Sequence, residues 1–474
     1  MSVSWWPAHR VAAAIAAREL SAREYLDAQL ARIERHDTGV SLVATLDERA
    51  WKMAEKADEA VVRGAPLGPL HGVAMTVKDC WATRGLRTTG GLELLRDYLP
   101  REDAVAVARL RAAGAIVFGK SNVPAGAGDL QAYNALFGVS RNPWNPDFST
   151  SGSSGGAAGA VAAGFTPVEL GSDIAGSIRL PAAACGVFGH KPSYGVVSLH
   201  GHVPPYPWKH TVADLAVGGP IARCAEDLEV LLTAMAGPHP WDERAWRVSL
   251  PAARPVTRVA TWFDDPYCQV DDEIRDALEQ AAALLGETGV TVEHARPLGI
   301  SLRKSDEIFR RLLAAAAVAN YTEDAVEAIA AGGLTTDGEL GGEFAAQRFW
   351  HWSRANEERA RLRTRWRQFF THYDAILLPV TANQVIKHDH RPLGERTVVV
   401  NGRHRPYWDQ LVWPGLTSVS YLPSTVVPLR LDSHGLPVGI AIATDYLDDL
   451  TALALARRLT EIVPPLGVPA SVAT

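Results

Sequence analysis

Short apolar segments alternate with helical patterns along most of this chain, and this alternation constrains the fold more than any other feature. Apolar runs predict strands at residues 73–77, 115–118, 166–170, 258–262, 375–379, 424–431 and 438–443. A capping box of Ser21 and Glu24 predicts a helix that reaches His36. Asp103 is expected to cap a second helix, and residues 447–462 to form a closing one. We expect an α/β fold with a large, mixed but mostly parallel twisted sheet, covered by helices on both faces.

The middle of the chain has a different pattern. Residues 240–370 are mostly helical, and the charged residues 385–405 are expected to form a surface loop. Seven arginines lie between positions 348 and 367, but Glu357 and Glu358 interrupt them, which is typical of a solvated helix face rather than a nucleic-acid surface. We interpret residues 1–474 as one domain with a mostly helical insertion at about 240–370.

Composition excludes several classes of protein. With 47% hydrophobic residues and a net charge of -6, the chain can bury a large core and is not expected to bind nucleic acid. The four cysteines lack CxxC spacing, so no zinc or redox motif is indicated and a reducing compartment suits them. No signal-peptide pattern and no run of 18 apolar residues is present, so a cytoplasmic protein without membrane contact is expected.

Two serine- and glycine-rich clusters lie on either side of one predicted strand. They read STSGSSGG at residues 149–156 and GSDIAGSIR at residues 171–179. A tight turn at residues 174–177 aims several backbone N–H groups at one point, as an oxyanion requires, and makes Ser177 a candidate nucleophile. For either cluster alone, an ordinary glycine-rich loop is the favoured interpretation.

A nucleophilic serine needs a base. None of the 15 histidines stands in a context that points to Ser177, and His71 and His190 are interpreted as structural. Lys78 follows an apolar run at an expected strand end, where burial would lower its pKa and leave a neutral amine. The alternative for Lys78 is a structural ion pair with a nearby carboxylate.

Several motifs occur together in a characteristic order. They lie at residues 70–79 (LHGVAMTVKD), 119–124 (GKSNVP), 142–145 (NPWN), 151–156, 171–179, 186–195 and 435–439 (GLPVG). In this order and over most of its length the chain resembles the amidase signature family. The resemblance implies a Ser–cis-Ser–Lys triad, with Lys78 as base, Ser153 as the bridging serine in a cis peptide, and Ser177 as nucleophile.

The same resemblance implies the rest of the site. The oxyanion hole falls on the backbone of Ile174, Ala175, Gly176 and Ser177, and the supporting residues are Ser154, Asp173 and Arg179. The sequence departs from the family pattern where Ser151 and Ala175 replace glycines. Alanine keeps its N–H, so the hole survives if φ at Ala175 is negative. The implied double displacement needs no metal and no organic cofactor.

The expected function is hydrolysis of small hydrophobic or aromatic amides, with anilides preferred over primary aliphatic amides and carbamates as a further option. The expected partner is a small-molecule amide or carbamate substrate, with no nucleic acid and no membrane, and a homodimer is left open. Most of the 14 tryptophans are expected to lie in the core, and a few aromatic residues are expected to line the pocket. The candidates are Trp144, Tyr206, Trp208, Trp350, Trp352, Tyr407, Trp408 and Trp413.

Three alternatives remain open. An A-type subunit of a glutamine-dependent transamidation complex, which needs a second protein, shares these motifs, although residues 406–414 (PYWDQLVWP) look too aromatic for a glutamine pocket. Residues 114–121 match the phosphate-loop pattern GxxxxGK[ST], but their middle reads as a strand rather than a loop. A catalytically dead binding protein on the same fold is disfavoured by the intact Lys78, Ser153 and Ser177.

Overall fold

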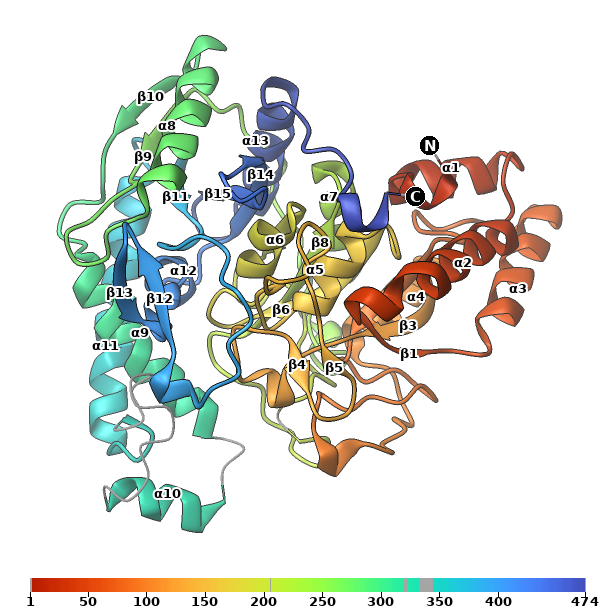
Figure 1. The fold of residues 1–474 in the computed structure, drawn as a ribbon, viewed down its shortest axis with the longest axis horizontal. Coiled ribbons are helices and arrows are strands. Elements are labelled where there is room, and N and C mark those ends of the chain that lie inside the picture. Colours follow the sequence, from red (N-terminus) through yellow and green to blue (C-terminus); the bar gives the residue numbers. More distant parts are fainter. Residues whose placement is uncertain (1, 205, 319–321, 332–343, 474) are drawn as a thin grey trace.

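A single sheet of eleven strands runs through the molecule (Figure 1). The computed structural model describes residues 2–204, 206–318, 322–331 and 344–473. The strand order in the sheet is β1-β3-β2-β6-β8-β7-β14-β15-β11-β9-β10, which puts β1 and β10 at opposite edges. These strands are β1 (Val43–Leu46), β2 (Ala74–Lys78), β3 (Ile116–Ser121), β6 (Val168–Asp173), β7 (Phe188–Lys191), β8 (Val217–Ala222), β9 (Arg258–Thr261), β10 (Thr291–His294), β11 (Ala375–Pro379), β14 (Ser424–Leu431) and β15 (Pro437–Ala443).

Parallel pairing is confined to two parts of the sheet. One is the catalytic block, which we define as β3, β2 and β6; the other is the distal block, β11, β9 and β10. All other neighbouring strands pair antiparallel. The sheet is mixed as expected, but it is less parallel than expected. One antiparallel pair follows directly from a short connection, because the turn between β14 and β15 can only join antiparallel neighbours.

Helices cover both faces of the sheet, as adjacent residues of β7 demonstrate. Gly189 faces Ala182 of α6, whereas the His190 ring bonds Asp449 at the start of α13. Successive residues of a strand point to opposite faces, so α6 and α13 lie on opposite sides. The helices are α1 (Ala8–Ala16), α2 (Ala22–Val40), α3 (Ala50–Val62), α4 (Val105–Ala112), α5 (Gly155–Ala162), α6 (Arg179–Cys185), α7 (Ala225–Met235), α8 (Asp272–Glu287), α9 (Leu302–Ala317), α10 (Glu323–Ala330), α11 (Phe349–Phe369), α12 (Val412–Val419) and α13 (Asp449–Ile462).

Two predicted local features are wrong. Asp103 does not cap α4; its carboxylate instead accepts from the Arg84 N–H and from Arg111, each at 2.7 Å. The expected surface loop at 385–405 contains a hairpin of β12 (Thr397–Val400) and β13 (Arg403–Pro406). Asn401 and Gly402 both have positive φ, as a two-residue hairpin turn requires. The charged flanking residues obscured this turn in the sequence.

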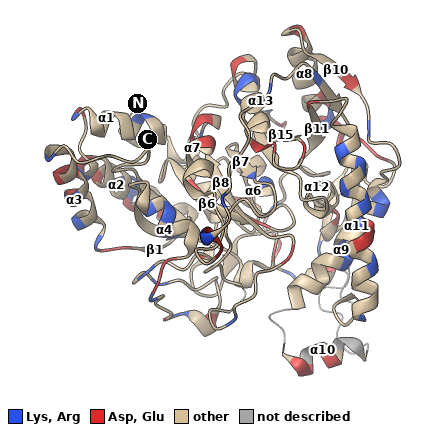
Figure 2. Ribbon diagram, turned by 180° about the vertical axis from the view of Figure 1, so that it is seen from behind, with Lys and Arg blue, Asp and Glu red and all other residues tan. Residues whose placement is uncertain are grey.

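The region from 240 to 370 contributes strands as well as helices. Besides the predicted β9, it supplies β10, which was not predicted because residues 291–294 lack a strong apolar pattern. Figure 2 shows basic and acidic residues together on α11. Arg359 pairs with Asp214 at 2.7 Å and Arg361 lies near Glu357, so the described arginines of this helix include members of ion pairs. Arg359 is buried, whereas Arg361 and Glu357 lie on the exposed side of the helix.

The segment that matched the phosphate-loop pattern lies mostly in a strand. Residues 116–121 form β3 in the buried part of the sheet, so Gly119, Lys120 and Ser121 are strand residues. Within the described chain, no helix is both apolar enough and long enough to cross a membrane.

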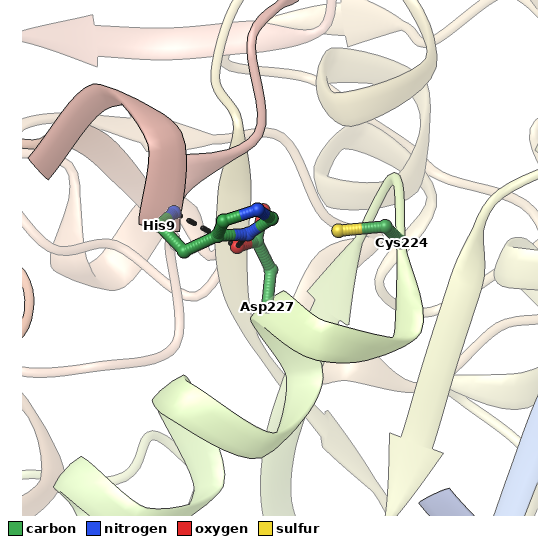
Figure 3. A group of neighbouring side chains, drawn as sticks. All are labelled: His9, Cys224 and Asp227. Carbon is green, nitrogen blue, oxygen red and sulfur yellow. Dashed lines mark hydrogen bonds and ion pairs between the residues drawn. The ribbon is translucent and has the colours of Figure 1, made fainter. Parts of the chain in front are cut away.

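Asp227 of α7 holds the first helix in place (Figure 3). Its two carboxylate oxygens accept from the N–H groups of Ala8 and His9, and one also contacts the His9 ring at 2.7 Å. Cys224 lies beside them, and burial raises the pKa of its thiol. Both carboxylate oxygens are therefore used in capping α1, for which Pro7 offers no side-chain cap.

Candidate active site

Lys78 occupies the carboxyl end of β2, the central strand of the catalytic block. Its side chain is fully buried, and its Nζ lies 2.7 Å from Ser153 Oγ and 3.0 Å from Ser172 Oγ. Burial lowers the pKa of Lys78 below the ordinary value of 10.5, although Cys80 and Asp173 act in the opposite direction. A lysine with this environment is able to act as a base when it has lost its proton.

Ser153 lies just before α5, in a sharply folded loop. The Gly152–Ser153 peptide bond is cis, as the resemblance implies. Residue 152 must be glycine because a Cβ atom there would come within 2.7 Å of the Asp129 carbonyl and the Gln131 nitrogen. This close approach fixes the Ser153 hydroxyl beside Lys78. The next residue, Ser154, ties the two serine clusters together, since its N–H donates to the Ser177 carbonyl at 3.0 Å.

A buried ion pair organises the second cluster. Asp173, the last residue of β6, pairs with Arg179 Nε at 2.9 Å, and Arg179 also donates to the Pro414 carbonyl and the Thr417 hydroxyl. Burial alone would raise the pKa of Asp173, but Arg179 outweighs it, and the pKa falls to about 2. Asp173 is therefore ionised at neutral pH and joins β6 to the start of α6. Arg179 is not among the residues that line the cavity described below.

The backbone N–H groups of this loop do not all face the same way. The Gly176 N–H donates to Asp173 Oδ1 at 2.7 Å, and Gly176 is absent from the cavity wall. The prediction that Gly176 belongs to the oxyanion hole is therefore at odds with this geometry. Ile174, Ala175 and Ser177 do line the cavity, and φ at Ala175 is not positive, which meets the condition for alanine at this position.

The serines and the loop meet at a cavity of about 390 Å³, and Lys78 lies buried behind Ser153 and Ser172. Ser153, Ser172 and Ser177 lie on its wall, and Ser177 is 6% exposed. Among the described residues, no hydrogen bond from the Ser177 hydroxyl is formed. The rest of the wall is largely apolar: Leu92, Leu130, Leu199, Val212, Leu313, Ala316, Ala317 and Leu411 are examples.

Only part of the predicted aromatic wall lines this cavity. Tyr206 and Trp408 are wall residues. Trp208 stacks on Tyr206 from outside, with ring centroids 4.8 Å apart. The prediction is wrong for those that pack elsewhere. Trp413 packs against Trp262 in the core, Trp144 bonds the Cys185 carbonyl, and Trp350 and Trp352 lie on α11. Tyr407 is buried behind the wall and donates to Asp129 at 2.7 Å.

Sequence reasoning missed His202 and gave Ser172 no role. His202 Nε2 lies 2.9 Å from Ser172 Oγ, and the same oxygen contacts Lys78, so Ser172 stands between the ring and the amine. His71 and His190, by contrast, bond the Ala57 carbonyl and Thr425, which lie outside the cavity wall. His202 stands in a loop without a pattern, so its position follows only from the folded chain.

The fold and these residues define an α/β protein with a buried lysine–serine pair at the carboxyl end of the parallel strands. The family model described as Amidase matches residues 24–453, and the chain belongs to this family. It is 34% identical to the A-type subunit of the glutamyl-tRNA(Gln) amidotransferase of Thermus thermophilus, over 96% of both chains.

Solved structures of enzymes are also similar to this chain over nearly its whole length. A bacterial aryl acylamidase of the amidase signature family superimposes with a TM-score of 0.79 at 26% identity, over 96% of both chains. A 6-aminohexanoate cyclic dimer hydrolase superimposes with a TM-score of 0.81 at 26% identity, over 99% of this chain and 100% of the other. The named relatives therefore include both hydrolases and an amidotransferase subunit.

Proposed function

We propose that this chain is an amidase that hydrolyses small hydrophobic or aromatic amides, anilides included, through an acyl intermediate on Ser177. One observation carries the proposal: the reacting serines open into a cavity with a largely apolar wall. An apolar wall favours a substrate whose acyl or amine part is apolar. Carbamates fit the same site, because their planar carbonyl needs the same donors.

The mechanism uses the contacts around Lys78. Neutral Lys78 accepts a proton from Ser153, which in turn accepts the proton of Ser177, and Ser177 Oγ attacks the carbonyl carbon. The N–H groups of Ile174, Ala175 and Ser177 stabilise the oxyanion. The proton returns through Ser153 to the leaving nitrogen, and the amine departs. Water then attacks the acyl-serine and releases the acid. The 2.7 Å contact between Lys78 and Ser153 supports this route.

The similarity to amidotransferase subunits supports a second candidate, a glutamine-using subunit that works with partner chains. Free glutamine carries a carboxylate that needs a cationic or N–H partner in an apolar cavity. The described wall residues include no lysine or arginine, and the wall carboxylate of Asp129 already pairs with Arg396 at 2.7 Å. These charges favour a neutral substrate over glutamine.

A hydrolysis panel with the isolated chain tests both candidates. The panel contains an acetanilide, a benzamide, an aryl carbamate, a short aliphatic amide and glutamine, with the Ser177→Ala variant as control. We expect the anilide to be hydrolysed faster than the aliphatic amide, and we expect no hydrolysis of glutamine. If glutamine is hydrolysed fastest and the anilide and the carbamate are not hydrolysed, the amidotransferase candidate replaces our proposal.

A further inference from the structure

His202 borders the cavity and is joined to Lys78 through a single hydroxyl group. Its Nε2 lies 2.9 Å from Ser172 Oγ, and the same oxygen lies 3.0 Å from Lys78 Nζ. The other ring nitrogen, Nδ1, lies 2.8 Å from the Pro204 carbonyl oxygen. Trp81 packs edge-on against the ring, with centroids 4.8 Å apart, and holds its orientation. These contacts form one continuous chain from Pro204 to Lys78.

The direction of every hydrogen bond in this chain can be assigned. A carbonyl oxygen only accepts, so Nδ1 of His202 carries the ring proton and Nε2 is left as an acceptor. Burial is the main cause that lowers the pKa of His202, to about 3, so the ring is neutral. Ser172 has one hydroxyl proton, and it donates this proton to Nε2.

This assignment determines how Lys78 is oriented. Because the Ser172 proton is already used, Ser172 only accepts from Lys78, and one N–H of the neutral amine points at Ser172 Oγ. A neutral amine has one lone pair, and this geometry leaves that lone pair for the Ser153 hydroxyl at 2.7 Å. Without an acceptor at Nε2, the Ser172 hydroxyl could donate to the Lys78 lone pair and compete with Ser153.

We propose that His202 is a positioning residue: by accepting the Ser172 proton, it keeps the Lys78 lone pair directed at Ser153. This inference rests on the proposed function, in which Lys78 is the base. It assigns a role to a cavity-wall residue whose hydrogen bond goes to Ser172, so that His202 acts on Lys78 through Ser172.

The test compares His202→Phe, which keeps an aromatic ring without an acceptor, with His202→Gln, which offers an amide oxygen. We expect His202→Phe to lower kcat by about 10- to 100-fold with KM little changed, since misplacing a reacting group costs this much. His202→Gln should recover part of the loss. His200→Phe is the matched control in the same loop, where His200 contacts His239 instead, and should behave as wild type.

The dependence of kcat on pH distinguishes a positioning role of His202 from a general loosening of the fold around Lys78. In His202→Phe the Ser172 hydroxyl has lost its acceptor. Its oxygen then accepts less well from protonated Lys78, and its O–H is free to donate to neutral Lys78. Both changes favour the neutral amine, so the acid limb of kcat should move to lower pH while the plateau falls. Loosening of the fold would admit water and move that limb upward, toward the ordinary lysine value. An upward shift, an unchanged plateau, or a Gln variant as poor as Phe would overturn the inference.

Ser172→Ala gives a second route if His202→Phe does not fold. The variant that combines His202→Phe with Ser172→Ala should be no slower than the slower of the two single variants, because both residues act through the same hydrogen bond. If the two losses in kcat multiply in the double variant, His202 and Ser172 do not act through one hydrogen bond, and the inference is contradicted. Labelling of Ser177 by an alkyl fluorophosphonate, followed by mass spectrometry across pH, gives the same comparison without any amide substrate. If the panel fails but labelling shows the expected shift, the proposed substrate class falls and the role of His202 stands.

Discussion

Two carboxylates near the carboxyl ends of parallel strands each pair with an arginine at the same distance. They differ in how deeply they are buried and in what lies beside them. Asp173 ends β6 in the catalytic block, and Glu293 lies near the end of β10 in the distal block. Both pairs, Asp173–Arg179 and Glu293–Arg258, have an N–O distance of 2.9 Å. The Asp173 side chain is 0% exposed, whereas that of Glu293 is 39% exposed.

The difference shows that burial, rather than topology or pair geometry, determines what such a pair does. Ligands in open α/β sheets bind at carboxyl strand ends, and both blocks offer such an edge of parallel strands. At the catalytic block the buried Asp173 carboxylate bonds Arg179 and the Gly176 N–H, and so holds the loop that carries Ser177 beside the cavity. At the distal block, the exposed pair borders an open depression that includes Thr261, Arg275 and His294. Exposed ion pairs of this kind contribute little to stability.

The largest expected effect is at Ser177, on the side of the comparison where the chemistry is proposed. Ser177→Ala should reduce kcat at least about 10³-fold, because no acyl intermediate can form, while the melting temperature stays close to that of wild type. Thr261→Val, at the end of β9 in the distal block, is the matched control. Near wild-type turnover by Ser177→Ala on the best substrate would remove Ser177 from the mechanism.

Lys78 should have the next largest effect. Lys78→Met should cost ~10²–10⁴-fold in kcat, the usual loss for a general base. In wild type, activity should rise with pH as Lys78 loses its proton, with a midpoint below the ordinary 10.5 because burial lowers its pKa. The measurement is kcat against pH for both proteins. A flat wild-type profile would contradict a base role for Lys78.

Asp173→Asn sharpens the comparison by removing charge from the buried pair alone. Breaking one partner of a buried pair costs about 3–5 kcal/mol of the free energy of unfolding. The folded pKa of about 2 lies below the ordinary 3.8, so this carboxylate stabilises the fold above pH 3.8. That contribution is lost as the pH falls from 3.8 through about 2. Urea unfolding at neutral pH and at about pH 3 should show a larger difference from wild type at neutral pH.

Glu293→Gln should have the smallest effect, although it changes a pair of the same length. Glu293 contacts Arg258 and the Tyr373 hydroxyl near the surface, away from the cavity. We expect kcat and KM to stay within twofold of wild type, measured on the best substrate of the panel. A loss as large as that of Asp173→Asn would break the comparison, because the exposed pair would then matter as much as the buried one.

Local sequence patterns located much of the sheet. The bounds of β11 and β14 match the predictions, because β11 is a continuous apolar run and β14 is rich in β-branched and apolar residues. Ser21 and Glu24 form the expected capping box. The predicted segment 166–170 was displaced, since β6 starts at Val168 and continues through polar residues to Asp173. A strand that ends in the site carries functional polar residues there, and these hide its end from a hydrophobic pattern.

Features that depend on distant parts of the chain were not predictable in this way. Lys78 and Ser153 were selected by motif resemblance, and their 2.7 Å contact joins residues 75 positions apart. His202 reaches Ser172 across 30 positions, from a loop with no periodic pattern. The direction of the Gly176 N–H depends on a single carboxylate orientation, which no pattern of residue types specifies.

The capture of the Gly176 N–H by Asp173 also bears on how this site could be altered. The carboxylate holds the loop through the N–H groups of Gly176 and Ile178 and through Arg179, so the side chains of Ile174 and Ala175 take no part in these bonds. Both residues nevertheless line the cavity. They are positions where substitutions change the shape of the pocket while the backbone donors keep their places. A library restricted to residues 174 and 175 should therefore yield variants that differ in substrate choice and retain the fold of the loop.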